Sequence, residues 1–512
     1  MKKILLNFKI VNKVAMWLRI RKWKRIIAES KMFDNEYYLF KNPDVKRANI
    51  DPLSHFLEFG SNEGRDPSEW FGVKKYLDSY PDVAQSGINP LAHYIMFGSQ
   101  EKRLVELNSI YKSSYLNVYQ DFVFNDLPIL TAQKYVDPMV SIIIPAYNQA
   151  IFTYKAIESI LQNANKISYE IIVIDDNSSE KDAIQIADKV RNIKYIRNNN
   201  NLGFLKNCNK AVSFAEGKYL VFLNNDVIVL PNWLSSLLDV LENNNDVGLV
   251  GSKLIFADGI LQEAGGIIWN DASGKNFGRG DDPKKSEYNY LREVDYVSGA
   301  SMAIRRDLFI NIGGFDERFA PAYYEDSDLA FTVRSLGLKV VYQPLSEIIH
   351  FEGVSHGTNV ELGIKKHQVI NRELFKKKWQ HVLHAHAKPN QKLFLAKDRS
   401  FGQKHILIIS HNISVTNKDP DNSLIYCLQF CQALDYVITL VPVDSIKNEK
   451  DVKPLQQKGI FVFYEDNGFS LLNHLKTFGH HYDFAYFTYP EIQCKFIKSV
   501  QAYTKAKILQ IK

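Results

Sequence analysis

The sequence predicts an α/β protein whose central sheet is mixed and mostly parallel. Between residues 140 and 230, short apolar or β-branched segments alternate with segments of helical periodicity, and the alternation resumes after residue 405. Strands that alternate with helices form a parallel sheet covered on both faces. Ahead of this region, a 38-residue pattern occurs twice and predicts a helical two-unit repeat. A chain of 512 residues is too long for one core, so we expect several domains.

The bulk composition is that of a globular protein. Hydrophobic residues make up 46% of the chain and charged residues 23%, with a net charge of +6. This excess suggests an anionic partner but is too small to indicate nucleic acid. The four cysteines form no CxxC pair, which favours reduced thiols in the cytoplasm. No apolar run reaches the roughly 18 residues of a membrane-spanning helix.

Residues 1–30 form a basic amphipathic segment. Nine lysines and arginines precede the first acidic residue, Glu29, and apolar residues such as Trp17 and Trp23 lie between them. Such a segment can lie on the anionic inner face of the cell membrane, which would make the protein peripheral there. A basic helix packed on the next domain, or a frayed end, remains an alternative.

Residues 31–105 contain the repeat. Its matched residues are Tyr38, Pro43, His55 and Gly60 in the first unit and Tyr76, Pro81, His93 and Gly98 in the second. Neither histidine has a cysteine or acidic partner at ligand spacing, so both are interpreted as hydrogen-bonded structural residues. We expect this region to serve docking or oligomerisation. Residues 106–138 are expected to connect it to the sheet, with a boundary at Pro138.

Polar residues follow the predicted strands of the sheet. Tyr147 comes after the strand that begins at Val140, and Asp175 and Asp176 follow the next one. The apolar run Tyr219–Leu223 is followed by two asparagines and then by Asp226. The carboxyl ends of parallel strands meet at one edge, which is where open α/β sheets bind ligands.

Five motifs carry a resemblance to a known family. They are Val140-Ser-Ile-Ile-Ile-Pro-Ala-Tyr-Asn148, Ile174-Asp-Asp-Asn-Ser178, Asn201-Leu-Gly203, Asn224-Asn-Asp226 and Tyr324-Glu-Asp-Ser-Asp328. In order and spacing, this set resembles family 2 glycosyltransferases with the GT-A fold, and within them the rhamnosyltransferase-like branch. The resemblance covers about residues 140 to 357 and predicts a GT-A nucleotide-sugar-binding domain over residues 139–385.

The resemblance implies a nucleotide site and a metal site. The residues implied to bind the nucleotide are Pro145, Tyr147, Asp175, Asp176, Asn201 and Asn225. Asp226 occupies the metal-binding last position of the family's DxD-type motif, whose first position is here Asn224. His350 matches a position that completes the metal shell in related enzymes. Oxygen ligands suit Mn²⁺ or Mg²⁺, and one imidazole favours Mn²⁺.

The resemblance also implies a catalytic base. Asp326 would take the proton of the acceptor hydroxyl, and its neighbour Glu325 would raise its pKa. Ser298 and Gly299 would line the donor and acceptor sugars. Residues 270–290, polar and glycine-rich, are expected to form a mobile loop over the site.

Each motif alone has a plainer interpretation. The acids at 175 and 176 could cap a helix, and the pair at 325 and 326 could be a solvated helix start. His350 could be a core histidine, and Asp328 and Arg334 are expected to be structural. His356 is a weaker candidate for a metal or phosphate. The order of the motifs favours the functional interpretation.

The C-terminal region predicts a second domain. Residues 386–404 are interpreted as a linker, and residues 405–512 alternate strand and helix. The latter resemble the N-terminal Rossmann half of a GT-B glycosyltransferase of the family 4 type. The second half of that fold does not follow, so we expect this domain to be truncated or degenerate, and inactive.

The resemblance implies an inverting, metal-dependent glycosyltransferase for bacterial surface polysaccharide such as capsule or O-antigen. Its partners would be a nucleotide-diphosphate sugar and a glycan or lipid-linked glycan, and no nucleic acid. One alternative is a sugar nucleotidyltransferase, which requires a glycine-rich phosphate loop unlike Pro145–Asn148. Another is a scaffold protein with an inactive transferase domain.

Overall fold

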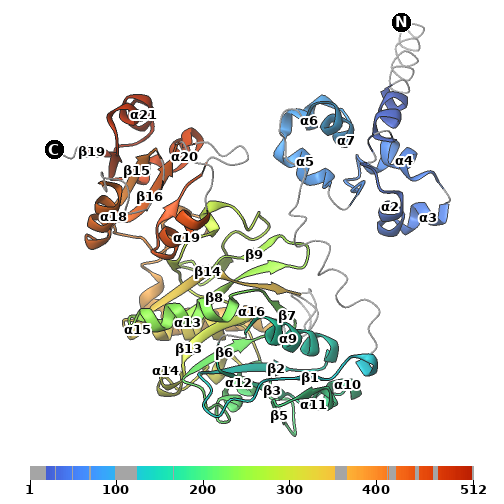
Figure 1. The fold of residues 1–512 in the computed structure, drawn as a ribbon, viewed down its shortest axis with the longest axis vertical. Coiled ribbons are helices and arrows are strands. Elements are labelled where there is room, and N and C mark those ends of the chain that lie inside the picture. The colour runs from blue at the N-terminus through green and yellow to red at the C-terminus, as the bar shows by residue number, and fades with distance from the viewer. Residues whose placement is uncertain are drawn as a thin grey trace, which may run out of the picture. The chain divides into compact units, whose positions relative to one another are not determined.

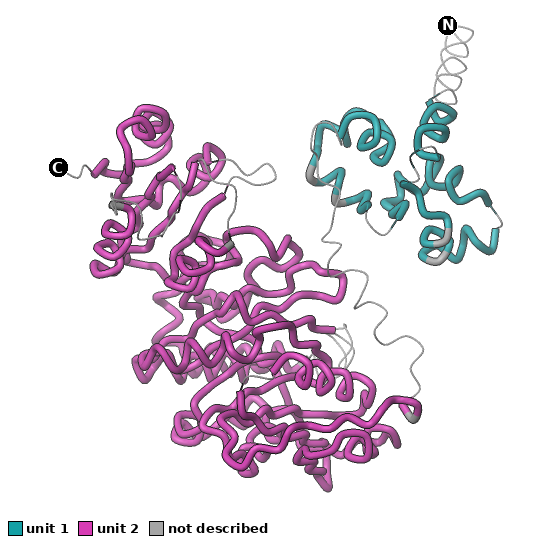
Figure 2. Tube along the Cα trace, viewed as in Figure 1, with its two compact units in different colours: residues 1–113 teal, residues 114–512 magenta. Residues whose placement is uncertain are grey.

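The computed structural model describes residues 19–98, 124–351, 366–411, 413, 423–443, 449–464 and 471–509, apart from residues 29, 31, 49, 69, 70, 165 and 166. Two compact units make up the chain, residues 1–113 and 114–512 (Figure 2). Residues 1–18 of the basic segment, most of the predicted connector and His356 lie outside the described residues. No helix among those described is long and apolar enough to cross a bilayer.

The first unit contains the predicted helical repeat, which the structure confirms. Its first copy comprises α2 (Asn35–Lys41), α3 (Pro43–Ala48), α4 (Pro52–His55) and the π-helix η1 (Phe56–Gly60). Its second copy comprises α5 (Val73–Ser79), α6 (Pro81–Ser86), α7 (Pro90–His93) and the π-helix η2 (Tyr94–Gly98). The second and third helices of each copy begin with a proline, whose missing N–H costs no hydrogen bond at that position.

A tyrosine–histidine pair joins the first and third helices of each copy. The Tyr38 hydroxyl lies 2.9 Å from His55 Nδ1, and the Tyr76 hydroxyl lies 3.0 Å from His93 Nδ1. Both tyrosines are buried. These contacts place the two histidines in structural hydrogen bonds.

Gly60 is required by this pair, which gives a first prediction. A Cβ at Gly60 would lie 2.0 Å from the Tyr38 hydroxyl oxygen. Gly60→Ala is therefore expected to destabilise the first unit by about 1–3 kcal/mol through overpacking, measured as a lower urea midpoint. In a Tyr38→Phe background the clashing oxygen is gone, so the added cost of Gly60→Ala should shrink. Equal costs in both backgrounds would contradict this account.

The second unit is built on a ten-stranded sheet of order β12-β14-β8-β13-β6-β2-β3-β5, with β7 paired to β14 and β9 to β8 (Figure 1). The strands are β2 (Val140–Ala146), β3 (Tyr169–Asp175), β5 (Lys194–Arg197), β6 (Tyr219–Leu223), β7 (Val227–Val229), β8 (Val247–Phe256), β9 (Leu261–Glu263), β12 (Arg292–Glu293), β13 (Ser301–Arg305) and β14 (Lys339–His350). The four strands β6-β2-β3-β5 are parallel, as predicted. The other half mixes both directions, and the predicted α/β class with a mixed sheet is confirmed.

Helices cover both faces of this sheet. They are α9 (Ala150–Asn163), α10 (Lys181–Ile184), α11 (Ile186–Lys189), α12 (Phe204–Val212), α13 (Trp233–Asn243), α14 (Arg306–Asn311), α15 (Glu325–Ser335) and α16 (Lys366–Leu383). Alternate strand residues enter opposite cores: Ile143 joins the cluster with α12 and α15, whereas Ile142 and Ile144 join the cluster with α9 and α13. Burial on both faces is why these strands are continuously apolar.

Residues 270–290 lie over the site, as expected, since several of them line the cavity described below, and they also contain short regular elements. They contain β11 (Gly274–Asn276), which forms a hairpin with β10 (Gly266–Ile268), and the 3₁₀ helix η4 (Ser286–Tyr288). Phe277 and Tyr288 are buried in the main core. Two apolar anchors thus order a segment whose polar composition suggested a loop.

The C-terminal domain has a five-stranded parallel sheet of order β17-β16-β15-β18-β19. Its strands are β15 (His405–Ser410), β16 (Val437–Pro442), β17 (Phe461–Val462), β18 (Phe484–Phe487) and β19 (Lys507–Leu509), and its helices are α18 (Ser423–Ala433), α19 (Glu449–Gln457), α20 (Leu471–Phe478) and α21 (Pro490–Tyr503). This confirms the predicted second Rossmann-like α/β domain. The sequence did not predict α19, which contains Pro454. The short helix α17 (Leu393–Ala396) precedes the domain.

Candidate active site

A cavity of about 1030 Å³ opens at the carboxyl ends of β2 and β6. The predicted site residues that line it are Pro145, Tyr147, Asp176, Asn201, Asn225, Asp226, Ser298, Asp326 and His350. Three further predicted residues, Asp175, Glu325 and Gly299, are not among its lining residues. The volume is sufficient for a nucleotide sugar.

Strand pairing brings Asp226 and His350 together. β7 begins directly after Asp226 and pairs antiparallel with the end of β14, with Val227 opposite His350. The backbone N–H of Phe351 donates to the Asp226 carbonyl at 3.0 Å. As a result, His350 Nε2 lies 3.4 Å from Asp226 Oδ1, although the two residues are far apart in sequence.

The pair fits a divalent cation. His350 Nδ1 lies 3.1 Å from Gln262 Oε1. Because an amide oxygen only accepts, Nδ1 donates to Gln262, and Nε2 is the ring nitrogen that faces the Asp226 carboxylate. An imidazole nitrogen beside a carboxylate oxygen is a donor set that suits Mn²⁺. The described residues contain no group of three or more His, Cys, Asp and Glu that could hold a metal.

The asparagines before Asp226 shape the bend between β6 and β7. The Asn224 backbone N–H donates to the Ala300 carbonyl at 3.0 Å. Asn225, which is buried, donates through Nδ2 to the Thr153 hydroxyl at 3.1 Å. The bend is thereby fixed to the start of β13 and to α9.

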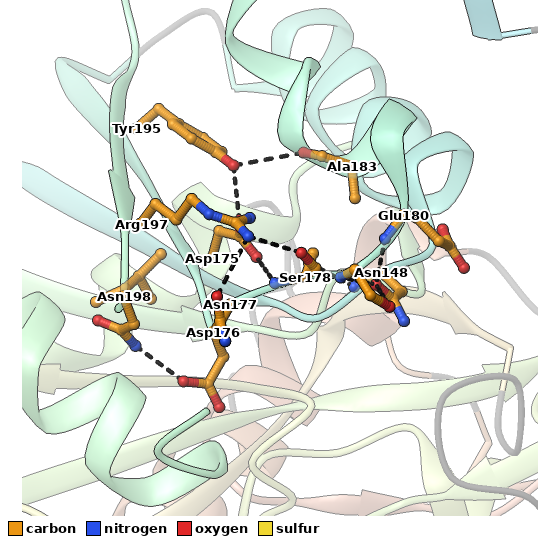
Figure 3. A network of polar contacts seen from close by, with 12 residues as sticks. Asn148, Asp175, Asp176, Asn177, Ser178, Glu180, Ala183, Tyr195, Arg197 and Asn198 are labelled. Atoms are coloured by element: carbon orange, nitrogen blue, oxygen red, sulfur yellow. Dashed lines mark hydrogen bonds and ion pairs between the residues drawn. The ribbon is translucent and has the colours of Figure 1, made fainter. Parts of the chain in front are cut away.

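Asp175 lies in a network of polar contacts at the end of β3 (Figure 3). Its carboxylate pairs with Arg197, accepts from the Tyr195 hydroxyl at 2.8 Å and accepts from the Ser178 N–H at 2.9 Å. Arg197 also donates to the Ser178 carbonyl at 2.7 Å. Asp175 therefore organises the loop after β3. It does not cap the next helix, whose N-cap residue is Glu180, so the capping alternative is wrong for Asp175.

Asp176 lines the cavity and holds the Asn201–Gly203 motif. Its carboxylate accepts from the backbone N–H groups of Leu202 and Gly203, both at 2.8 Å. It also accepts from Asn198 Nδ2 at 2.8 Å (Figure 3). Gly203 has φ +79°, and a Cβ there would lie 2.9 Å from Pro321 Cβ, so a glycine is required.

Tyr147 offers an aromatic face at the mouth of the cavity, since 44% of it is exposed. The following residue, Asn148, has a positive φ of 56° and accepts through Oδ1 from the N–H groups of Ser179 and Glu180 at 2.8 and 3.1 Å (Figure 3). The loop that carries Tyr147 is therefore anchored to the loop after β3. A fixed aromatic ring can stack on a nucleotide base.

The acidic pair begins α15. Asp326 Oδ2 accepts from the Gly299 N–H at 3.2 Å, and Oδ1 accepts from the Ser327 N–H at 2.6 Å. Glu325 is buried, and its Oε2 has no hydrogen-bond partner among the described residues. Burial raises the pKa of both carboxyls, and the Asp326 charge raises that of Glu325 further. Asp326 accepts from more donors than Glu325 does, and its charge raises the pKa of Glu325, so Asp326 ionises first and Glu325 keeps its proton.

The pair gives a prediction for stability against pH. When the pKa of a carboxyl is higher in the folded than in the unfolded state, the protein loses stability as pH rises from the unfolded-state pKa through the folded-state pKa. Wild type should therefore lose stability relative to Glu325→Gln between about pH 5 and about pH 8, as measured by urea midpoints. Parallel pH curves for the two proteins would refute the raised pKa of Glu325.

Asn371 fixes the backbone that leads to the pair. Tyr323 and Tyr324 have positive φ values of 76° and 71°, a conformation that costs free energy in residues with a side chain. Asn371 is buried on α16 and donates through Nδ2 to the carbonyls of Phe319, Ala322 and Tyr323 at 2.6, 2.9 and 2.9 Å. Sequence reasoning missed Asn371, because no spacing signal links it to this loop.

The same helix holds α15 in place. Asp328 accepts from Trp379 Nε1 at 2.8 Å and from Lys378 Nζ at 2.7 Å. Arg334 pairs with Asp295 at 3.1 Å. Asp328 and Arg334 are thus placed in structural contacts, as expected.

Asn371→Leu is expected to displace Asp326 and to lower kcat more than it raises KM. The change leaves three carbonyls without their donor, at a cost of about 1–3 kcal/mol for a buried group. Steady-state kinetics would measure the split between kcat and KM. Gln380→Leu, the same kind of change on the exposed face of α16, is the matched control and should alter neither. An equal loss of kcat in both variants would contradict the role assigned to Asn371.

Ser298 and Gly299 lie between β12 and β13. Ser298 lines the cavity, whereas Gly299 contributes its N–H to Asp326. A Cβ at Gly299 would meet its nearest neighbour, Asp326 Cβ, at an ordinary 3.8 Å. The main effect of this motif is therefore to orient Asp326. Lining residues that sequence reasoning did not single out include Glu263, Lys275, Arg279 and Asp281.

One family model matches part of the chain. Residues 141–313 match the family model described as Glycosyl transferase family 2. The matched residues 141–313 contain Asp176, Asp226 and Ser298. Asp326, on α15, and His350, at the end of β14, lie beyond them.

Two curated relatives each align with about half of the chain or less. The uncharacterized protein y4gI of Sinorhizobium fredii is 30% identical over 51% of this chain and 30% of its own length. The O-antigen biosynthesis protein RfbC of Myxococcus xanthus is 28% identical over 43% of this chain and 18% of its own length. The chain thus spans less than a third of either relative. Among solved structures, GalNAc-T7 with UDP, GalNAc and Mn²⁺ aligns at 15% identity with a TM-score of 0.37, covering 51% of this chain and 57% of that one.

Proposed function

We propose that this protein is an inverting, metal-dependent glycosyltransferase that moves a sugar from a nucleotide-diphosphate donor to a glycan. One observation carries the proposal: the Asp226–His350 pair and the Asp326 carboxylate line the same cavity. A group that can hold a cation and a group that can take a proton are the two requirements of sugar transfer from a diphosphate. The family 2 match supports the same reaction.

The donor would be held by side chains at the ends of β2 and β6. Tyr147 stacks on the base, and Asp176 keeps the Asn201–Gly203 motif against the nucleotide. Asp226 and His350 would hold Mn²⁺ or Mg²⁺ next to the diphosphate. When bound, the ion neutralises the negative charge that develops on the leaving diphosphate.

Asp326 acts as the general base. Its carboxylate accepts the proton of the acceptor hydroxyl as the hydroxyl oxygen attacks the anomeric carbon. The N–H groups of Gly299 and Ser327 orient it. Glu325 retains its proton and so adds no second negative charge beside the base. One displacement with the base on the acceptor side inverts the anomeric configuration.

We propose membership of the rhamnosyltransferase-like branch, and a lipid-linked or glycan acceptor in capsule or O-antigen synthesis at the inner face of the membrane. The printed name of the Myxococcus xanthus relative supports the O-antigen part. The five-stranded parallel sheet supports an origin of the C-terminal domain in the Rossmann half of a GT-B enzyme. The helical repeat is assigned to docking or oligomerisation.

Thermal stabilisation tests the proposal. Wild-type protein would be heated with UDP, GDP and dTDP, each with and without Mn²⁺, and the matching sugar nucleotides would then be assayed for hydrolysis. A ligand at a hundred times its Kd stabilises by about 2.7 kcal/mol, so at least one nucleotide should raise Tm when Mn²⁺ is present. No rise with any nucleotide would reject the proposal. Binding without sugar release from any donor would favour the scaffold alternative.

A further inference from the structure

Two segments that line the cavity continue into the C-terminal domain. Tyr288 lines the cavity from η4, and Leu393 lines it from α17. Tyr290, two residues after Tyr288, and Phe394, one residue after Leu393, are buried in the apolar cluster of the C-terminal sheet. Phe461 of β17 belongs to the same cluster. The cavity wall and the C-terminal core therefore share the same stretches of chain.

Aromatic rings and cations alternate between the cavity and β17. The Arg292 guanidinium carbon lies 4.9 Å from the ring centre of the cavity-lining Phe277 and 5.3 Å from that of Tyr290. Lys397 Nζ lies 4.9 Å from the Tyr290 ring centre and 5.2 Å from that of Phe461. The rings of Tyr290 and Phe461 are also stacked, with centroids 5.4 Å apart. We call these five residues the aromatic–cation bridge.

The residues of the bridge are buried, and two of them are cations. Phe277, Tyr290, Arg292, Lys397 and Phe461 are all buried. Burial disfavours the ammonium form of Lys397, but Tyr290 and Asp398 outweigh burial and hold the pKa of Lys397 above its usual range. Lys397 Nζ donates to the Tyr290 hydroxyl. A cation that stays charged away from water makes the strongest contacts with aromatic faces.

Hydrogen bonds near the aromatic–cation bridge also join the cavity-lining half of the unit to the C-terminal domain. The Leu291 N–H donates to the Gln456 carbonyl of α19 at 2.9 Å. Gln343 of β14 donates through Nε2 to Gln457 Oε1 at 2.8 Å. Arg292 also donates to the Glu287 carbonyl at 3.0 Å, within the wall itself. Leu291, just after the cavity-lining residues, is thus bonded to the C-terminal domain, and the Tyr342 hydroxyl of β14 donates to the Tyr288 carbonyl at 2.9 Å.

We propose that the C-terminal α/β domain is a positioning element of the donor cavity, and that the aromatic–cation bridge holds the wall at residues 277–288 in the shape that binds the nucleotide diphosphate. The inference rests on the proposed function only for the identity of the ligand. Lys397 and Phe461 are positioning residues, because they act through Tyr290 and Arg292 and do not line the cavity.

Lys397→Met tests the inference in the full-length protein. Methionine keeps the apolar stem but removes the cation, so the wall should loosen. Amide hydrogen exchange at residues 277–281 of the ligand-free protein should become at least about tenfold faster. The KM for the donor, or the dissociation constant of the nucleoside diphosphate that stabilises wild type, should rise roughly three- to tenfold, while kcat changes little.

Leu428→Ala is the matched control. Leu428 is buried on α18 in the other core of the C-terminal domain, away from the bridge, so this change lowers stability without moving the wall. Faster exchange and higher KM in Lys397→Met alone support the inference. Unchanged exchange in Lys397→Met, or equal increases in both variants, overturn it. If wild type binds no nucleoside diphosphate, the proposed function fails, while the exchange measurement still decides the role of the bridge.

Discussion

Asp326→Asn is expected to lower kcat by about 100- to 10,000-fold, the usual contribution of a general base. An amide has nearly the shape of the carboxylate but cannot take the proton of the acceptor hydroxyl. Donor binding should persist, so KM for the nucleotide sugar should change far less than kcat. Single-turnover transfer, or donor hydrolysis where the acceptor is unknown, would measure the loss.

The pH profile and a neighbouring variant sharpen this prediction. The pKa of Asp326 is raised by burial, so the rate should rise with pH through a midpoint above that of an ordinary aspartate. Glu325→Gln is the comparison. Because Glu325 holds its proton in the folded protein, its neutral mimic should cost far less activity than Asp326→Asn. A larger loss in Glu325→Gln than in Asp326→Asn would transfer the role of base to Glu325.

Asp226→Ala is expected to abolish the effect of Mn²⁺ on nucleotide binding and to lower kcat/KM by at least about 100-fold, as losses of transition-state charge stabilisation do. Asp226 is the carboxylate that His350 faces at 3.4 Å. Since this pair supplies few protein ligands, Mn²⁺ should bind weakly until the diphosphate adds its oxygens. Calorimetric titration of Mn²⁺ with and without nucleoside diphosphate would measure both effects.

Asp175→Asn is the matched control for Asp226→Ala. Asp175 is also a buried acid and ends a strand of the same sheet, but it is paired with Arg197. The control should lose stability and keep the dependence on Mn²⁺. Tight Mn²⁺ binding to the nucleotide-free wild type, or a Mn²⁺ effect that survives Asp226→Ala, would rule out the assigned metal site.

The sequence by itself determined the features that depend on neighbours along the chain. Apolar runs such as Val140–Ile144 and Tyr219–Leu223 are strands in the structure because both sheet faces are covered. The repeat at 38 residues predicted two copies of one helical unit, and the strands from His405 onward predicted the second sheet. Polar residues after strand ends also indicated the edge where the cavity opens.

Only the tertiary structure decided which of those polar residues meet. His350 reaches Asp226 because β14 pairs with β7, and Asp175 is separated from the cavity because Arg197 and Tyr195 enclose its carboxylate. Asn371 and the aromatic–cation bridge were not predicted at all. Their contacts join segments far apart in sequence, and such contacts follow from strand order and packing, which local periodicity does not encode.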